Sequence, residues 1–151
     1  MTRVMASGVF DIVHSGHLHY LQEARRLGDE LVVVVATDAT VRRRKHEPII
    51  PEKMRLELVS ALKPVDAAVL GGEGDMFAVV ENVRPDIIAI GYDQDFDVIK
   101  VEESLRKRGL DVKVVRVGAN GEDLTATRKI IQRVVDWYSI NKNSVDRGDG
   151  K

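Results

Sequence analysis

One run of six consecutive apolar residues, residues 31–36 (LVVVVA), constrains the fold more than any other feature of the chain. Four of the six are valines, and β-branched side chains favour a strand over a helix. A strand without polar positions has both faces covered, which is typical of a parallel sheet between layers of helices. The run therefore predicts an interior strand of an α/β fold.

Similar short apolar runs alternate with segments of helical periodicity along the rest of the chain. We expect strands over residues 4–7, 31–36, 67–70, 86–90 and 112–115. We expect helices over residues 16–28, 51–62, 76–82, 101–108 and 125–138, with the polar segment 38–50 as a connecting loop. Strands and helices that alternate over short links predict a doubly wound, Rossmann-like α/β domain. Its five-stranded parallel sheet should carry helices on both faces.

Length and composition narrow the class of protein further. A chain of 151 residues fits one domain. We place this domain at residues 1–140 and expect residues 141–151, which lack apolar periodicity, to form a flexible tail. The net charge of −1 gives no reason to expect nucleic acid or a membrane as partner. The absence of cysteine excludes disulfides and thiol chemistry, and together with the lack of a signal peptide it favours the cytoplasm.

The segment GVFDIVHSGH, residues 8–17, joins the first strand to the first helix, at the edge where such sheets bind ligands. His17 should lie in the first turn of that helix, where backbone N–H groups and the helix dipole attract anions. His14 can face the same point, and Gly8 and Gly16 allow a phosphate to approach the backbone closely. Two imidazoles beside a helix N-terminus suit the binding of phosphate oxygens during phosphoryl or nucleotidyl transfer.

These ten residues also match the G-x-F-D-x-x-H-x-G-H signature of the cytidylyltransferase-like nucleotidyltransferases at every specified position. Enzymes of that family transfer a nucleoside monophosphate from a nucleoside triphosphate to a phosphate-bearing acceptor and release pyrophosphate. The resemblance implies that His14 and His17 contact the triphosphate and stabilise the transition state, and that Asp11 faces the acceptor or a magnesium ion. The nucleotide-binding residues that it implies in this loop are Gly8, Val9, Phe10, His14, Ser15, Gly16 and His17.

The resemblance covers roughly residues 4–130 and implies further site residues after the second strand. The ATDAT segment places Asp38 at the carboxyl edge of the sheet, and four basic residues, 42–45, follow it. Family members carry a lysine here that reaches the triphosphate; Lys45, or else Arg44, is the candidate. Arg55 matches a recurring arginine at the start of the next helix, and we group it with Asp38 as close to the acceptor or metal.

Two later segments complete the candidate site. Asp93, in GYDQDF after the fourth strand, matches a family aspartate near the ribose of the nucleotide. Before the last helix the family commonly has R-T-E-G-I-S-T-T, whose hydroxyls and backbone N–H groups bind phosphate. This chain has NGEDLTATRKI, so Thr125 and Thr127 would take the hydroxyl roles, and the Arg-Thr pair is missing. For one of the two threonines, helix capping alone is the simpler interpretation.

The sequence indicates the type of reaction more clearly than it indicates the substrates. The segments PIIPEKMRLELVSALKPVDAAVLG and RPDIIAIGYDQDFD resemble archaeal-type FAD synthases, which adenylate FMN with ATP. Glycerol-3-phosphate cytidylyltransferases tend to have G-D-D-W in the second segment, and they remain the alternative. A non-catalytic nucleotide sensor is a third possibility, whereas the missing G-x-G-x-x-G disfavours a dehydrogenase. We favour transfer of AMP from ATP to FMN, although the cysteines found near the C-terminus of some archaeal FAD synthases are absent here.

The expected partners are therefore small molecules, a nucleoside triphosphate and a phosphorylated acceptor. No cluster of His, Asp and Glu in the sequence suggests a closed metal cage, which suits Mg²⁺ or another divalent cation arriving with ATP. The sequence does not report oligomeric state. Transferases of this kind often pair, so a homodimer stays an open alternative, with Trp137 or Tyr138 at its surface.

Overall fold

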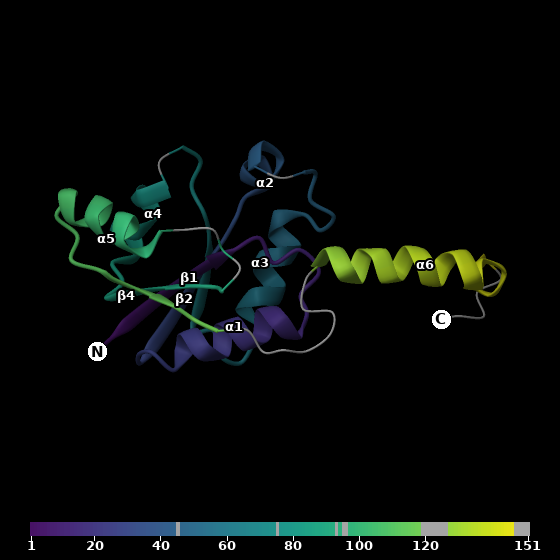
Figure 1. The fold of residues 1–151 in the computed structure, drawn as a ribbon, viewed down its shortest axis with the longest axis horizontal. Coiled ribbons are helices and arrows are strands. Elements are labelled where there is room, and N and C mark those ends of the chain that lie inside the picture. The colour runs from purple at the N-terminus through teal and green to yellow at the C-terminus, as the bar shows by residue number, and fades with distance from the viewer. Residues whose placement is uncertain (45, 75, 93, 95–96, 119–126, 147–151) are drawn as a thin grey trace.

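The computed structural model describes residues 1–44, 46–74, 76–92, 94, 97–118 and 127–146. Five strands, all parallel to their neighbours, form one sheet in the order β3-β2-β1-β4-β5 (Figure 1). The strands are β1 (Arg3–Gly8), β2 (Glu30–Val35), β3 (Ala67–Leu70), β4 (Ile87–Ile90) and β5 (Lys113–Arg116). The strand order reverses between β1 and β4, and ligands of such sheets bind outside the carboxyl ends of the strands at this point.

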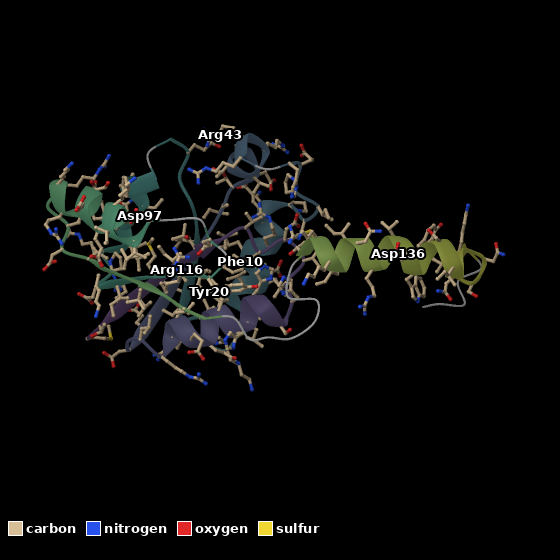
Figure 2. The ribbon with its side chains drawn as sticks, in the orientation of Figure 1. Phe10, Tyr20, Arg43, Asp97, Arg116 and Asp136 are labelled. Carbon is tan, nitrogen blue, oxygen red and sulfur yellow. The ribbon has the colours of Figure 1, made fainter. Side chains whose placement is uncertain are left out.

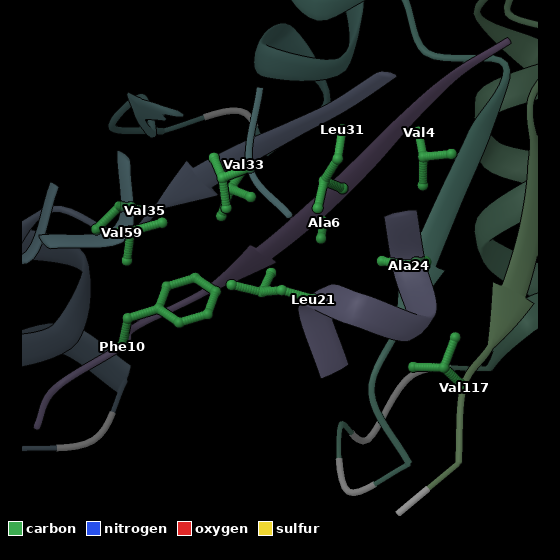
Figure 3. Close-up of a cluster of buried hydrophobic side chains, with 12 residues drawn as sticks. Val4, Ala6, Phe10, Leu21, Ala24, Leu31, Val33, Val35, Val59 and Val117 are labelled. Atoms are coloured by element: carbon green, nitrogen blue, oxygen red, sulfur yellow. The ribbon is translucent and has the colours of Figure 1, made fainter. Parts of the chain in front are cut away.

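Helices cover both faces of the sheet. They are α1 (Ser15–Arg25), α2 (Asp38–Arg44), α3 (Glu52–Ser60), α4 (Met76–Val83), α5 (Val98–Lys107) and α6 (Thr127–Asp146). One core cluster joins the sheet to Leu21 of α1 and Val59 of α3 (Figure 3), and the other joins it to Val80 of α4 and Leu105 of α5. The expected doubly wound α/β fold is confirmed. In contrast to the other helices, α6 extends away from this body (Figure 1).

The valine-rich strand β2 contributes side chains to both hydrophobic core clusters. Leu31, Val33 and Val35 pack toward α1 and α3, while Val32 and Val34 pack toward α4 and α5. This division follows from the two-residue period of a strand. All five side chains are at most 7% exposed. The expectation that this strand is covered on both faces is therefore confirmed.

Two segments differ from the sequence-based expectations. The segment expected as a loop begins with helix α2, because Thr37 Oγ1 caps it by accepting a hydrogen bond from the Thr40 backbone N–H and Val41 buries its side chain. The last helix ends at Asp146 rather than Tyr138 and so crosses the predicted domain boundary at residue 140. Residues 147–151 of the predicted tail lie outside the described residues.

Candidate active site

The two histidines cap the helix that follows β1. His14 is the N-cap residue of α1, and its Nδ1 accepts a hydrogen bond from the Gly16 backbone N–H at 3.0 Å. His17 lies three residues further on, and its Nδ1 accepts from the His14 backbone N–H at 3.2 Å. This reciprocal arrangement is a capping box, in which imidazoles stand where Ser or Thr and Glu or Gln are usual.

These hydrogen bonds determine which ring nitrogen carries the proton. An Nδ1 that accepts a hydrogen bond has no proton of its own, so each neutral ring carries its proton on Nε2. The two rings lie against each other, with centroids 3.9 Å apart and planes inclined by 31°. The histidine pair therefore lies beside the N-terminus of α1, where the helix dipole favours an anion.

The loop leading to these histidines is held in an unusual conformation. Phe10 and Ile12 have φ angles of 57° and 59°, in the left-handed region that is rare for residues other than glycine, and especially for a β-branched residue. Such a conformation costs on the order of 1–3 kcal/mol per residue and persists only when the surrounding structure enforces it.

Asp11, between these two residues, supplies much of that enforcement. Its carboxylate is buried and accepts hydrogen bonds from the backbone N–H groups of Ile49 and Ile50, both at 2.8 Å. Its backbone carbonyl accepts from the Thr127 hydroxyl at 2.8 Å. Both carboxylate oxygens are thus bound to the chain, where they fasten the loop to residues 49–50. The expected contact of Asp11 with the acceptor or a metal ion stays a prediction.

Arg55 is a second buried anchor, and its expected place close to the acceptor or metal stays a prediction. Its side chain is 0% exposed. Its Nε donates to the Ile50 carbonyl at 2.8 Å, and its Nη1 donates to the carbonyls of Val9 and Ala36 at 2.8 and 2.7 Å. Arg55 thus ties the carboxyl ends of β1 and β2 to α3.

Asp38 balances the charge of this arginine. Arg55 Nη2 lies 2.7 Å from Asp38 Oδ1. Burial pushes the pKa of Asp38 upward, but hydrogen bonds from Arg55 and the Glu52 backbone, together with the charges of Arg55 and Arg42, outweigh burial and hold the pKa below its ordinary value. Asp38 is therefore ionised at neutral pH. Its expected place near the acceptor or metal stays a prediction.

Some of the other predicted site residues lie within the described part of the chain, and others do not. Gly8 ends β1, and the loop that follows brings Val9, Phe10, Ser15 and Gly16 to the same carboxyl edge of the sheet. Lys45, Asp93 and Thr125 lie outside the described residues, and their roles stay predictions. Thr127 is described, and it contacts the loop through its hydroxyl, as given above.

Two residues that contact β4 or the segment after it were not predicted from the sequence. Arg116, the last residue of β5, donates from Nη1 to the carbonyls of Gly91 and Gln94 at 3.1 and 2.8 Å. Tyr20 of α1 donates its hydroxyl proton to the Ala89 carbonyl at 2.8 Å and thus links α1 to β4 (Figure 2). No local pattern in the sequence singled out Arg116, because β5 (KVVR) carries a charged residue at each end.

Among the described residues, no three His, Cys, Asp or Glu side chains form a group that could hold a metal ion. Within the same part of the chain, no helix combines the length and hydrophobicity that a membrane crossing needs.

The fold and the capped histidine pair define a nucleotide-handling α/β domain of the doubly wound class. The sequence matches the profile of the family described as cytidylyltransferase-like over residues 5–144, and the chain belongs to this family. The resemblance inferred from residues 8–17 is therefore confirmed.

Curated relatives give the subfamily. A protein of Aciduliprofundum boonei named FAD synthase is 58% identical over 149 residues, which are 95% of this chain and 100% of that protein. A protein of Archaeoglobus profundus with the same name is 56% identical and covers 90% of this chain and 88% of its own. The expected resemblance to archaeal FAD synthases is confirmed.

A solved structure of a relative has a similar fold. A protein of Thermoplasma volcanium named a lipopolysaccharide core biosynthesis protein is 55% identical, with a TM-score of 0.78 over 79% of this chain and 98% of that chain.

Proposed function

We propose that this protein is an FMN adenylyltransferase that transfers AMP from ATP to FMN, giving FAD and pyrophosphate. The capped histidine pair is the observation that carries the chemistry, and the relatives named FAD synthase support FMN as the acceptor. A phosphate oxygen of FMN attacks the α-phosphorus of ATP, the bond from this phosphorus to the bridging oxygen breaks, and pyrophosphate leaves with the bonding electron pair.

The histidines act by donating hydrogen bonds and not by removing a proton. FMN phosphate is already an anion at neutral pH, so it attacks without a protein base. Negative charge builds on the phosphate oxygens in the transition state, and two Nε2–H donors beside a helix N-terminus stabilise it. Because the backbone holds both Nδ1 atoms, the donors are oriented before the substrate binds.

The buried anchors play a positioning role in this proposal. Asp11 and Arg55 hold the loop that carries His14, and neither touches the reacting atoms. In this proposal the divalent cation enters bound to the ATP phosphates. The roles of Lys45 with the triphosphate and Asp93 with the ribose are part of the proposal, as is a cytoplasmic location.

The test is pyrophosphate release with ATP or CTP, each combined with FMN or glycerol 3-phosphate, in Mg²⁺. We expect release only with ATP and FMN, together with FAD identified by mass. Release only with CTP and glycerol 3-phosphate would overturn FMN adenylylation and make the chain a cytidylyltransferase. Nucleotide binding without release in any pair would instead support a sensor.

A further inference from the structure

The two central strands of the sheet, β1 and β4, pair over only part of their length. Their register ends with Ala6 opposite Ala89. Beyond this point β1 continues along β2, where Gly8 pairs with Val35, and β4 continues along β5 as far as Ile90. The two strands therefore separate at their carboxyl ends, at the place where the strand order reverses and where such sheets bind ligands.

Side chains bind the backbone groups that face this gap. Tyr20 supplies one hydroxyl, which accepts a hydrogen bond from the Ser7 N–H at 3.3 Å. The same hydroxyl lies 2.8 Å from the Ala89 carbonyl oxygen and 3.3 Å from the Ser7 carbonyl oxygen. A hydroxyl has a single proton, and the shorter contact receives it. The Ser7 carbonyl therefore depends on a second donor.

Gln94 is that donor, and it bridges the gap. The Gly91 N–H, which can only donate, lies 2.7 Å from Gln94 Oε1 and so fixes the orientation of the side-chain amide. The Nε2 group on the other side donates to the Ser7 carbonyl at 3.3 Å. One side chain thus connects the segment after β4 to the end of β1, two residues before the histidine loop (residues 9–14) begins.

The segment after β4 is closed into a turn. The Gln94 N–H donates to the Gly91 carbonyl at 3.1 Å, which is the hydrogen bond of a β-turn. Arg116 of β5 donates to the carbonyls of both residues and holds the turn from the opposite side (Figure 2). Tyr92 within it is 50% exposed. We call this segment, of which Gly91, Tyr92 and Gln94 are described, the β4 turn.

The three bridging side chains connect different parts of the site. Tyr20 joins β1 to β4 itself, and Arg116 joins the β4 turn to β5. Gln94 joins the β4 turn to β1, the strand that leads into the histidine loop. The spacing between the β4 turn and the histidine loop therefore depends on the Gln94 amide.

We propose that Gln94 is a positioning residue that aligns the α-phosphorus of the nucleotide with the histidine pair. The inference rests on the proposed function, in which the histidines bind the phosphates and Asp93 of the β4 turn binds the ribose. Gln94 acts through the backbone of Ser7 and Gly91 and does not touch the reacting atoms. Alignment matters because a displacement of about 1 Å lowers the rate of an enzymatic reaction by about 100-fold.

Two substitutions of Gln94 test the bridge. Gln94→Met keeps the length of the side chain but loses both hydrogen bonds, whereas Gln94→Glu keeps an acceptor for the Gly91 N–H and loses the donor to Ser7. Because the bridge needs both ends, kcat should fall by about 10–100-fold in both variants. The KM values should change by less than about threefold, since the groups that contact the substrates remain. Gln22→Met, the same replacement at an exposed position of α1, is the matched control and should keep its kcat.

A double-mutant cycle with His17→Ala separates alignment from a general loss of structure. If Gln94 acts by aligning phosphate with the histidines, Gln94→Met should cost less than about threefold in kcat when His17 is already replaced, because interacting residues are not additive. Circular dichroism and urea unfolding confirm that every variant is folded under the assay conditions. An equal loss of kcat in both backgrounds would overturn the proposal.

Three further results would also overturn it. Near-normal kcat in Gln94→Glu would mean that only the Gly91 end of the amide matters. Near-normal kcat in Gln94→Met would mean that the bridge does not affect the reaction. A raised KM for the nucleotide with unchanged kcat would make Gln94 a binding residue. Each comparison uses pyrophosphate release with the nucleotide and acceptor that the unsubstituted protein accepts, so a reaction with CTP overturns FMN adenylylation and leaves this test in place.

Discussion

At the scale of single residues, the unusual feature is that the proposed catalytic groups are also the helix cap. Replacing His14 or His17 with Ala should lower kcat by about 10²–10³-fold, the effect of losing one donor to transition-state charge. His14→Ser keeps a good N-cap and should show the same loss, which separates chemistry from folding. His19→Ala, on the same helix, is the control. Near-normal kcat in both histidine variants would contradict the mechanism.

Because Arg55 makes several buried contacts, we expect its replacement to lower the stability of the fold strongly. Arg55→Ala leaves three backbone carbonyls and Asp38 without their partner, so the free energy of unfolding should fall by about 3–5 kcal/mol, as for other broken buried ion pairs. Lys53→Ala, at an exposed position of the same helix, should change it by less than about 0.5 kcal/mol. Urea unfolding measures both, and equal values would show that the buried network does not stabilise the fold.

The lowered pKa of Asp38 leads to a prediction of how the stability contributed by the Arg55–Asp38 ion pair depends on pH. The pKa of Asp38 in the folded protein is below the ordinary 3.8, so folding favours the ionised form. The stability it contributes is fully present above pH 3.8 and is lost as the pH falls through the lower folded value. The stability difference between the unsubstituted protein and Asp38→Asn should therefore be largest at neutral pH and shrink in acid. Urea unfolding across this range checks it; a constant difference would contradict the ion pair.

At the scale of elements, the junction between α1 and β2 depends on close backbone packing. A Cβ added at Gly28 would lie 2.7 Å from the Thr2 carbonyl oxygen and 2.8 Å from Val4 Cγ2. Gly28→Ala should therefore lower the free energy of unfolding by about 1–3 kcal/mol, the usual cost of overpacking. Gly118→Ala is the matched control, because no described atom lies within 4 Å of its added Cβ. Thermal unfolding should separate the two variants.

Local sequence patterns predicted the strands because each strand is a short run of mainly apolar residues. Such a run either alternates with a two-residue period or is buried on both faces. The local patterns missed α2, where a single cap at Thr37 and one buried valine decide the conformation of a polar segment. They could not predict that Asp11 anchors the loop, because its partners are 38 and 39 residues away and become neighbours only in the fold. Motif matching found Asp11 and Arg55 as important, but only tertiary contacts reveal that they are anchors.

At the scale of the whole molecule, the chain consists of two sequential halves. The first ends with β3 and the second begins with α4, and in the sheet they meet where β1 pairs with β4. Fragments divided between Gly72 and Glu73, in the turn after β3, should therefore reassemble and restore FAD formation when mixed. Neither fragment alone should be active, because the histidine loop and the β4–β5 edge lie on different fragments. Activity in the first fragment alone would contradict a site spanning both halves.

The histidine capping box also limits how this protein can adapt to heat. Serine, asparagine or aspartate would start α1 more stably, and such cap replacements are among the simplest stabilising changes available to most helices. Here natural selection cannot use them, because the cap is also the proposed catalytic apparatus. Lineages that live at higher temperature must therefore gain stability elsewhere, while this helix start stays fixed in their sequences.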